Sequence, residues 1–320
     1  MIGVIGAGAF GTALATILHR AGKPVILWGR NQDSLDSIAN TQSLPKYLGA
    51  TKLPDDLPIS ADISTLTNCR VLLLAIPVQK MTGFLDEIEL PNTAADLIIC
   101  GKGLLKENAI LPSQLLQTYY PDASIMALSG PSFAVDLAMG NPTALTLAGS
   151  DLIRAKATQE YLSTDSLRLY HSDDLVGVQY CGAFKNVYAI GAGAVMGAGL
   201  GHSASAALTT RAFNELQHLI KALGGDTKTA FGLSGLGDLL LTTSSDKSRN
   251  YRFGFALGAN QAWDQTITVE GAATAQALQK LAKAHNLDLP IANQVLGLIA
   301  GQTDVNRAIK TLMQRSLRAE

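Results

Sequence analysis

Six short, continuously apolar runs in the first half of the chain constrain its fold more than any other feature. They cover residues 2–5, 25–28, 71–74, 97–100, 125–128 and 143–147. A strand that is apolar at every position has both faces buried, which is typical of a parallel sheet covered by helices. Helical patterns at 12–20, 81–88 and 113–119 alternate with the runs. This alternation predicts a doubly wound α/β domain.

The second half of the chain has a different pattern. Beyond about residue 169 the strand-like runs stop, and helical patterns follow at 177–195, 203–223, 274–285 and 291–300. A length of 320 residues also suits two domains. We therefore expect an α/β domain over residues 1–172 and an all-α domain over residues 173–320.

Composition excludes several classes of protein. With 25 Lys and Arg against 26 Asp and Glu, the net charge of -1 offers no basic surface for nucleic acid. The 47% hydrophobic and 16% charged residues exclude a disordered chain. Three cysteines lie more than 30 residues apart and form no CxxC pair, so we expect neither a disulfide framework nor a metal site. The sequence has no recognisable secretory segment, and a cytoplasmic protein is expected.

One uncharged stretch, residues 186–201, is the nearest the chain comes to a membrane span. It contains five glycines and is shorter than the roughly 20 apolar residues that cross a bilayer. A buried core helix is therefore the interpretation we adopt, and no membrane insertion is expected.

The turn after the first apolar run carries the first functional motif. Residues 6–11 read Gly-Ala-Gly-Ala-Phe-Gly, a GxGxxG pattern that follows a strand and opens a helix. Gly6 permits the tight turn, Gly8 lets a pyrophosphate approach the backbone, and Gly11 allows close packing of helix on strand. A glycine-rich turn without a ligand is the structural alternative. The context favours a Rossmann-type domain that binds NADP or NAD.

A residue two positions after the second run bears on the choice between these cofactors. NAD-preferring sites usually place an acidic residue near this point, whereas this chain has Arg30. A guanidinium can bind the 2′-phosphate of NADP through two hydrogen bonds. We therefore expect NADP to be preferred. The alternative is a solvated surface arginine that leaves the choice open.

Polar residues follow two later runs, at the sheet edge where open α/β folds bind their ligands. Lys102 stands between two glycines, and residues 129–132 read Ser-Gly-Pro-Ser at the start of a helix. A cation and unpaired helix N–H groups at this edge suit an anionic ligand. A surface lysine and an ordinary helix cap are the structural alternatives.

Lys185 is the only formally charged residue between positions 175 and 210. An ammonium in an apolar helix is desolvated, which lowers its pKa and eases proton exchange near neutral pH. We interpret Lys185 as a candidate catalytic acid and base. The alternative is a lysine that reaches water from the helix end.

A second polar cluster lies further along the chain. Residues 235–238 read Gly-Leu-Gly-Asp, and residues 248–250 read Ser-Arg-Asn. An arginine flanked by hydroxyl and amide donors suits a phosphate monoester. Asp238 could orient Lys185 or accept a hydrogen bond from a substrate hydroxyl. The alternative for residues 248–250 is a solvated loop.

Together these motifs resemble those of one enzyme family. The segments 6–11, 101–103, 129–134, 185–187, 235–238, 248–250 and 269–271 occur in the order seen in bacterial NAD(P)-dependent glycerol-3-phosphate dehydrogenases. The resemblance covers nearly the whole chain. It implies a cytoplasmic enzyme that reversibly reduces dihydroxyacetone phosphate to sn-glycerol 3-phosphate, which supplies phospholipid synthesis.

The same resemblance implies the role of each site residue. Lys185 would be the proton donor and acceptor. The substrate-binding residues would be Lys102, Gly130, Ser132, Lys185, Asp238, Ser248, Arg249 and Asn250. The cofactor-binding residues would be Gly6, Gly8, Ala9, Phe10, Gly11, Arg30, Lys102, Ala134, Arg249, Val269 and Glu270. The chain departs from the family at Gly101, where threonine is common, and this predicts a looser loop.

Two other functions stay open at this point. A related NADP-dependent hydroxyacid or ketoacid dehydrogenase would use residues 248–250 to bind a carboxylate. A non-catalytic NADPH-binding regulator would keep Lys185 for structure alone. The apolar helical domain could also provide the surface of a homodimer.

Overall fold

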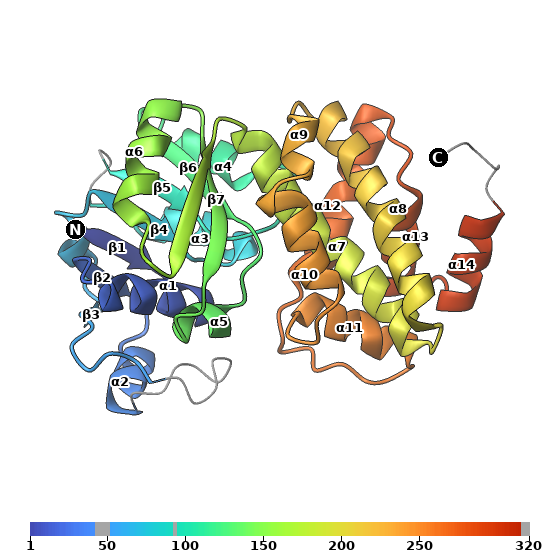
Figure 1. Cartoon of the computed structure of the whole chain (residues 1–320), viewed down its shortest axis with the longest axis horizontal. Coiled ribbons are helices and arrows are strands. Elements are labelled where there is room, and N and C mark those ends of the chain that lie inside the picture. The colour runs from blue at the N-terminus through green and yellow to red at the C-terminus, as the bar shows by residue number, and fades with distance from the viewer. Residues whose placement is uncertain (42–51, 92–94, 315–320) are drawn as a thin grey trace. The chain divides into compact units, whose positions relative to one another are not determined.

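The computed structural model describes residues 1–41, 52–91 and 95–314 of the chain. The chain divides into two compact units (Figure 1). The first comprises Met1–Lys102 and Leu111–Gln179, and the second comprises Gly103–Ile110 and Tyr180–Glu320.

The first unit is built on a sheet whose described strands run in the order β3-β2-β1-β4-β5-β6-β7-β8. Their bounds are β1 Ile2–Ile5, β2 Val25–Trp28, β3 Ile59–Ser60, β4 Val71–Leu74, β5 Asp96–Ile99, β6 Ser124–Ser129, β7 Thr143–Gly149 and β8 Leu167–Ser172. The order of the first six strands is that of doubly wound dinucleotide-binding folds. β1, β2, β4 and β5 are buried at every position. The predicted α/β architecture is confirmed.

Short helices connect these strands. Their bounds are α1 Ala9–Arg20, α2 Gln32–Thr41, a 3₁₀ turn Ile63–Leu66, α3 Val78–Glu87, α4 Pro112–Tyr119, α5 Ala134–Ala138 and α6 Leu152–Leu162. In α1, every residue from Gly11 to Leu18 is buried. Residues of α1 and the strands belong to one hydrophobic core, which fixes the start of α1 at the end of β1.

The sheet differs from the expected all-parallel arrangement at β7, which is antiparallel to β6. The other neighbouring pairs of described strands are parallel. The helix between β6 and β7 is α5, which has five residues and is therefore about 7.5 Å long. Such a helix is too short to carry the chain back across the sheet for a parallel strand, which needs a longer crossover.

Two strands, β3 and β8, were not predicted. In β8, Leu167 and Leu169 are buried, whereas Arg168 and Tyr170 are exposed. A half-exposed edge strand has an alternating sequence, so it lacks the continuous apolar run that marked the others. β3 has only two residues.

The described residues of the second unit form helices joined by loops, with no strand among them, as predicted. Its elements are α7 Leu175–Gly197, which begins in the first unit, α8 Gly201–Ala222, α9 Thr227–Ala230, a π-helical turn Leu233–Gly237, α10 Asp238–Thr243, α11 Arg249–Gly258, α12 Glu270–His285, α13 Pro290–Ile299 and α14 Val305–Met313. Residues 178–195 of α7 are buried, so this helix forms the core of the unit. Among the described residues, none of the helices combines the length and apolar character needed to cross a bilayer.

Glycines let α7 and α11 approach each other at backbone distance. A Cβ atom on Gly254 would lie 1.9 Å from the carbonyl oxygen of Ile190, and one on Gly193 would lie 2.0 Å from that of Tyr251. Small residues on both helices therefore replace the usual side-chain layer. This contact fixes the start of α11 relative to the middle of α7, where Lys185 stands.

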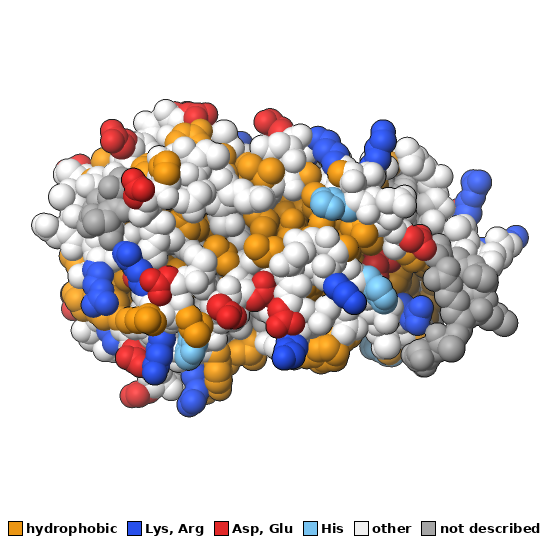
Figure 2. All heavy atoms as spheres, turned by 90° about the horizontal axis from the view of Figure 1, so that it is seen from above, with side chains coloured by type: hydrophobic (Ala, Val, Ile, Leu, Met, Phe, Trp, Pro, Cys, Tyr) orange, Lys and Arg blue, Asp and Glu red, His pale blue; other side chains and the backbone are white. Residues whose placement is uncertain are grey.

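Charged side chains of both signs are interspersed on the face of the molecule drawn in Figure 2. This distribution agrees with a net charge of -1. With charges mixed on this face and nearly balanced in total, a bound anion depends on groups in its immediate neighbourhood.

Candidate active site

The loop between β1 and α1 is shaped by two glycines. Gly6 has a φ of +113°, and a Cβ atom there would lie 2.6 Å from the carbonyl oxygen of Ala75. A Cβ atom on Gly11 would lie 2.0 Å from the carbonyl oxygen of Gly6. The tight turn and the close packing of α1 therefore both require glycine, as the sequence predicts.

Gly8 has a different environment from its two neighbouring glycines. It is exposed at the N-cap of α1, and a Cβ atom there would meet nothing within 4 Å. Helix α1 begins with Ala9 and Phe10. Glycine at the N-cap offers no side-chain oxygen to the first N–H groups of this helix. Open space over the N-terminus of a twelve-residue helix fits the pyrophosphate of a dinucleotide.

Arg30 lies next to this loop, just beyond the end of β2. A Cβ atom on Gly29 would lie 3.0 Å from the Cβ atom of Ala7, so the backbone here packs against the glycine-rich turn. The Arg30 side chain is exposed, and its Nη1 atom lies 3.1 Å from Oε2 of Glu87 at the end of α3. Arg30 is thus beside the predicted cofactor loop but already has an acidic partner.

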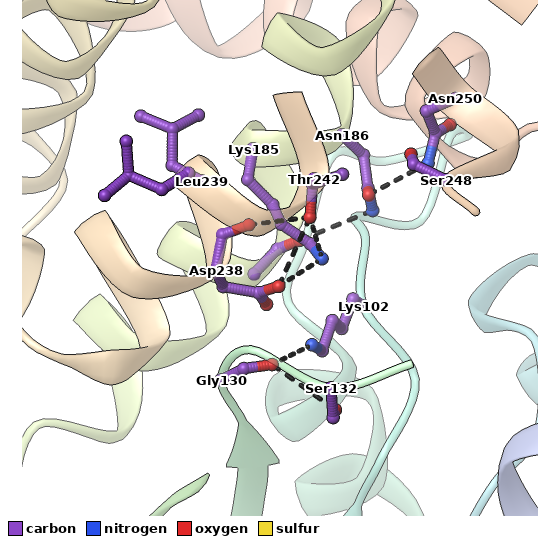
Figure 3. A network of polar contacts seen from close by, with 12 residues as sticks. Lys102, Gly130, Ser132, Lys185, Asn186, Asp238, Leu239, Thr242, Ser248 and Asn250 are labelled. Atoms are coloured by element: carbon purple, nitrogen blue, oxygen red, sulfur yellow. Dashed lines mark hydrogen bonds and ion pairs between the residues drawn. The ribbon is translucent and has the colours of Figure 1, made fainter. Parts of the chain in front are cut away.

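The ends of β5 and β6 bring three predicted residues together in the first unit. Nζ of Lys102 donates a hydrogen bond of 2.9 Å to the carbonyl oxygen of Gly130, and Oγ of Ser132 lies 3.4 Å from the same oxygen. Gly130 has a φ of +139°, which favours glycine at this turn. Figure 3 shows the ammonium and the hydroxyl converging on one carbonyl group.

The loop at Gly101 is closely packed, contrary to the looser loop expected there. A Cβ atom on Gly101 would lie 2.7 Å from the carbonyl oxygen of Ile76 and 3.2 Å from Val78 Cγ2. The chain beyond β5 therefore approaches the chain beyond β4 more closely than a threonine would permit.

Lys185 is the centre of a buried network in the second unit (Figure 3). Its Nζ atom donates to Oδ1 of Asp238 at 2.5 Å and to Oγ1 of Thr242 at 2.8 Å. Lys185 is 7% exposed and Asp238 is fully buried. A buried ammonium requires a counter-charge, and Asp238 supplies it. The ammonium is therefore held in one place rather than extended into water.

The local sequence explains how Asp238 reaches the lysine. Residues 233–237 form a π-helical turn, and a Cβ atom on Gly235 would lie 2.1 Å from the carbonyl oxygen of Ala230. Asp238 opens α10 directly after this turn, and Thr242 lies one helical turn later on the same face. Oγ1 of Thr242 donates to the carbonyl oxygen of Asp238 at 2.6 Å. This hydrogen bond orients the lone pairs of the Thr242 hydroxyl group toward the ammonium.

A second chain of hydrogen bonds links α7, α11 and α12. Nδ2 of Asn250 donates to Oδ1 of Asn186 at 2.9 Å, and the backbone N–H of Gly271 donates to Oδ1 of Asn250 at 2.9 Å. A Cβ atom on Gly271 would lie 2.5 Å from the carbonyl oxygen of Asn186, so the motif at 269–271 requires its glycine. The amide of Asn250 is thus fixed beside the residue that follows Lys185.

The other residues of the Ser-Arg-Asn motif are also held in place. Ser248 caps α11 by accepting a hydrogen bond from the N–H of Tyr251. Nη2 of Arg249 lies 2.9 Å from Oε1 of Glu270 at the start of α12. Because Arg249 is 40% exposed at its side chain, its guanidinium keeps donors that face water.

The structure therefore groups the predicted residues into two sets, one in each unit. The first unit holds Gly6, Gly8, Ala9, Phe10, Gly11, Arg30, Lys102, Gly130, Ser132 and Ala134, the last at the start of α5. The second unit holds Lys185, Asp238, Ser248, Arg249, Asn250, Val269 and Glu270. Among the described residues, we find no group of three His, Cys, Asp or Glu that could hold a metal ion.

Sequence reasoning missed three residues that complete these sets. Thr242 bonds Lys185, Asn186 bonds Asn250, and Glu87 pairs with Arg30. The spacing of Thr242, four residues after Asp238, was the available signal. No local pattern points to Glu87, because its contact arises only when α3 packs beside the end of β2.

Comparisons with known proteins agree with this geometry. Family models described as the N-terminus and the C-terminus of NAD-dependent glycerol-3-phosphate dehydrogenase match residues 1–155 and 174–310. The glycerol-3-phosphate dehydrogenase (NAD(P)+) of Ruegeria sp. strain TM1040 is 46% identical over 319 residues, which cover 100% of this chain and 99% of the relative. That of Cereibacter sphaeroides is 45% identical over 320 residues and is covered completely, as is this chain.

A solved structure gives the same result. The crystal structure of glycerol-3-phosphate dehydrogenase from Coxiella burnetii matches with a TM-score of 0.89 and 32% identity, covering 98% of each chain. The two family models, the relatives and the fold thus agree over both units. The chain belongs to the family of NAD(P)-dependent glycerol-3-phosphate dehydrogenases, which are oxidoreductases.

Proposed function

We propose that the chain catalyses the reversible reduction of dihydroxyacetone phosphate to sn-glycerol 3-phosphate with NADPH or NADH. The observation that carries the proposal is the buried contact of Lys185 with Asp238 and Thr242, in the same unit as the Ser-Arg-Asn motif. Family membership supports the same reaction. In the cell, we infer that this cytoplasmic enzyme supplies glycerol phosphate for phospholipid synthesis.

Lys185 is the proton donor and acceptor of this mechanism. During reduction, negative charge develops on the carbonyl oxygen of the substrate, and an ammonium can stabilise it and then transfer a proton. Asp238 and Thr242 each accept a hydrogen bond from the same nitrogen, so two directions around it are fixed. A substrate oxygen would bind to the ammonium that these two contacts hold in place. In oxidation, Lys185 takes the proton back.

Phosphate recognition is assigned to Arg249, Asn250 and Ser248. A guanidinium forms bidentate, charge-assisted hydrogen bonds with phosphate oxygens. Binding at the phosphate holds the reacting carbon in place, because remote binding energy can be used for orientation. Lys102, Gly130 and Ser132 are assigned to the substrate as well, and Lys102 is shared with the cofactor.

We assign cofactor binding mainly to the domain formed by residues 1–172, and the proton-transfer residue to the domain formed by residues 173–320. Gly6, Gly8 and Gly11 shape the pyrophosphate site, with Ala9 and Phe10 at the start of α1. Further contacts are assigned to Ala134, Arg249, Val269 and Glu270. The bound nicotinamide supplies the hydride. Arg30 favours NADPH over NADH in this proposal.

The decisive experiment is the initial rate of cofactor oxidation with dihydroxyacetone phosphate, measured with NADPH and NADH at equal concentrations. Substantial turnover with formation of glycerol 3-phosphate is expected, and NADPH should be the faster cofactor. Proven cofactor binding without turnover on this substrate would overturn the proposed reaction. A panel of ketoacids run in parallel tests the related-dehydrogenase alternative.

Arg249→Ala tests the phosphate assignment. The variant should lose about 30-fold or more in kcat/KM for dihydroxyacetone phosphate, because a charge-assisted contact is removed. Unphosphorylated dihydroxyacetone, which lacks this contact, should be affected much less. Equal losses on both substrates would contradict the phosphate contact and leave Arg249 only its assigned contact with the cofactor, beside Glu270.

A further inference from the structure

The acidic partner of Arg30 has no role in the reaction proposed above. Glu87 comes from the last position of α3, and its carboxylate lies 3.1 Å from the guanidinium. The two side chains are 73% and 62% exposed. An exposed ion pair is weak and is screened by salt, so a bound anion can draw the guanidinium away from Glu87.

Packing within the first unit keeps Glu87 opposite Arg30. The rings of Trp28 and Phe84 meet edge to face, with centroids 5.9 Å apart, and both residues are buried. Arg30 follows Trp28 by two residues, and Glu87 follows Phe84 by three, which places it on the same face of α3. A buried aromatic contact therefore sets the distance between two exposed charges.

Because the Arg30–Glu87 pair lies beside the glycine-rich turn, the Glu87 carboxylate can affect which cofactor binds there. Gly29 packs against Ala7 of that turn, and Arg30 is the next residue. A 2′-phosphate carries more negative charge than a 2′-hydroxyl group, so a neighbouring carboxylate repels the phosphate more. A hydroxyl group, in contrast, can donate a hydrogen bond to a carboxylate.

We propose that Glu87 is a specificity-determining residue: it competes with the 2′-phosphate of NADP for Arg30 and so limits the preference for NADPH over NADH. The proposal rests on the assignment of the adenosine end of the cofactor to this region. Arg30 attracts the phosphate and Glu87 opposes it, which lets one site accept both cofactors. The strength of the preference is then set by the pair rather than by Arg30 alone.

Binding of adenosine nucleotides without nicotinamide tests the proposal independently of turnover. Adenosine 2′,5′-bisphosphate and 5′-AMP are titrated by calorimetry into the wild type and into Glu87→Gln, which removes the charge and keeps the shape. The variant should bind the bisphosphate about three- to tenfold more tightly. Its affinity for 5′-AMP should stay the same or fall. The ratio of kcat/KM for NADPH and NADH should shift by a similar factor.

Two further variants separate a specific effect from a general one. Glu89→Gln removes an equal charge from an exposed position two residues away, and it should leave both affinities unchanged. In an Arg30→Ala background, Glu87→Gln should improve binding of the bisphosphate much less, because only the direct repulsion between carboxylate and phosphate is left to remove. An unchanged affinity ratio in Glu87→Gln, or an equal gain in Glu89→Gln, would overturn the proposal.

These experiments test the role of Glu87 separately from the proposed reaction. If the nucleotide affinities shift as expected but dihydroxyacetone phosphate is not reduced, the role of Glu87 stands and the reaction is wrong. If the substrate is reduced but the affinity ratio does not respond to Glu87→Gln, the reaction stands and the role of Glu87 is wrong.

Discussion

The glycine-rich turn of the first unit and the lysine network of the second unit are built in opposite ways. At the turn, Gly6 and Gly11 permit close backbone packing because they have no side chain, and Gly8 leaves open space above a helix N-terminus. In the network, Lys185 and Asp238 act through side chains that are buried and bonded to each other. One region offers backbone groups to a ligand, and the other offers a single charged atom.

This difference matters for how each region tolerates change. A dinucleotide site spreads its binding over many backbone contacts, so one substitution removes only a part of it. In the proposed mechanism, proton transfer depends on one atom, Nζ of Lys185, whose partner Asp238 is 53 residues away in the sequence. A single substitution in the turn should therefore weaken cofactor binding only in part. Removal of the Lys185 ammonium should remove proton transfer as a whole.

The largest expected effect comes from that atom. Lys185→Met keeps an unbranched side chain of similar length but removes the proton donor, so kcat should fall by about 10²- to 10⁴-fold. Steady-state kinetics with dihydroxyacetone phosphate measure the loss, and NADPH fluorescence titration should show that the cofactor still binds.

A control is needed because methionine leaves the buried carboxylate of Asp238 without its cation. The double variant Lys185→Met/Asp238→Asn removes that unpaired charge and should recover stability without recovering activity. Recovery of activity in the double variant, or near-normal turnover in Lys185→Met, would contradict the assignment of Lys185.

Much of the first unit could be predicted because four of its central strands, β1, β2, β4 and β5, are buried on both faces. Each of the six apolar runs forms a strand, since a short run of this kind has few other ways to be buried. The direction of β7 could not be predicted, because a hydrophobic pattern is the same for a parallel and an antiparallel neighbour. β8 escaped because it alternates between buried and exposed residues.

The site shows the same division between local and tertiary information. The burial of Lys185 could be predicted because a lone charge in an apolar helix is visible in the sequence, and the tight turn could be predicted because the glycines at residues 6–11 form a contiguous motif. Thr242 resembles an ordinary helix residue until α10 packs against α7. Glu87 acquires a partner only through the aromatic contact that positions α3. Local sequence patterns therefore do not predict contacts between segments that are distant in the sequence.

The buried carboxylate of Glu215 differs from that of Asp238, because no salt bridge to a cation is found for it within the described part of the chain. Glu215 of α8 is 6% exposed and accepts hydrogen bonds from the N–H groups of Ile291 and Ala292 at the start of α13, and from Tyr188. Burial raises the pKa of Glu215 from 4.5 to about 7, and Asp288 contributes in the same direction, while these hydrogen bonds lower it. The hydrogen bonds thus offset only part of the cost of burying the charged form of Glu215.

This pKa makes the stability of the protein depend on pH. The folded protein holds a proton on Glu215 that the unfolded chain has released, so the stability it provides is complete below about pH 4.5 and is lost as pH rises to about 7. The loss should be on the order of 3 kcal/mol. Urea unfolding from pH 5 to 8 should show the wild type losing free energy of unfolding relative to Glu215→Gln, whose side chain does not titrate. Parallel curves for the two proteins would contradict this prediction.

The smallest expected effects test the region built from backbone. Gly11→Ala places a Cβ atom 2.0 Å from the carbonyl oxygen of Gly6 and 2.9 Å from Cβ of Ala75, so α1 or the turn must shift. Overpacking of this kind should lower the free energy of unfolding by about 1–3 kcal/mol, measured by urea denaturation. Cofactor affinity should fall as well, because the shape of the turn changes.

Gly8→Ala is the matched control for Gly11→Ala, because it should change cofactor affinity without changing the stability of the protein. Its Cβ atom meets nothing in the protein, so the free energy of unfolding should stay within about 0.5 kcal/mol of the wild type. The added methyl group occupies the space that the pyrophosphate needs, and the Kd for NADPH should rise about tenfold, which corresponds to about 1.4 kcal/mol. Unchanged NADPH affinity in Gly8→Ala, together with unchanged stability, would show that the turn does not hold the pyrophosphate and that Gly8 is glycine for another reason.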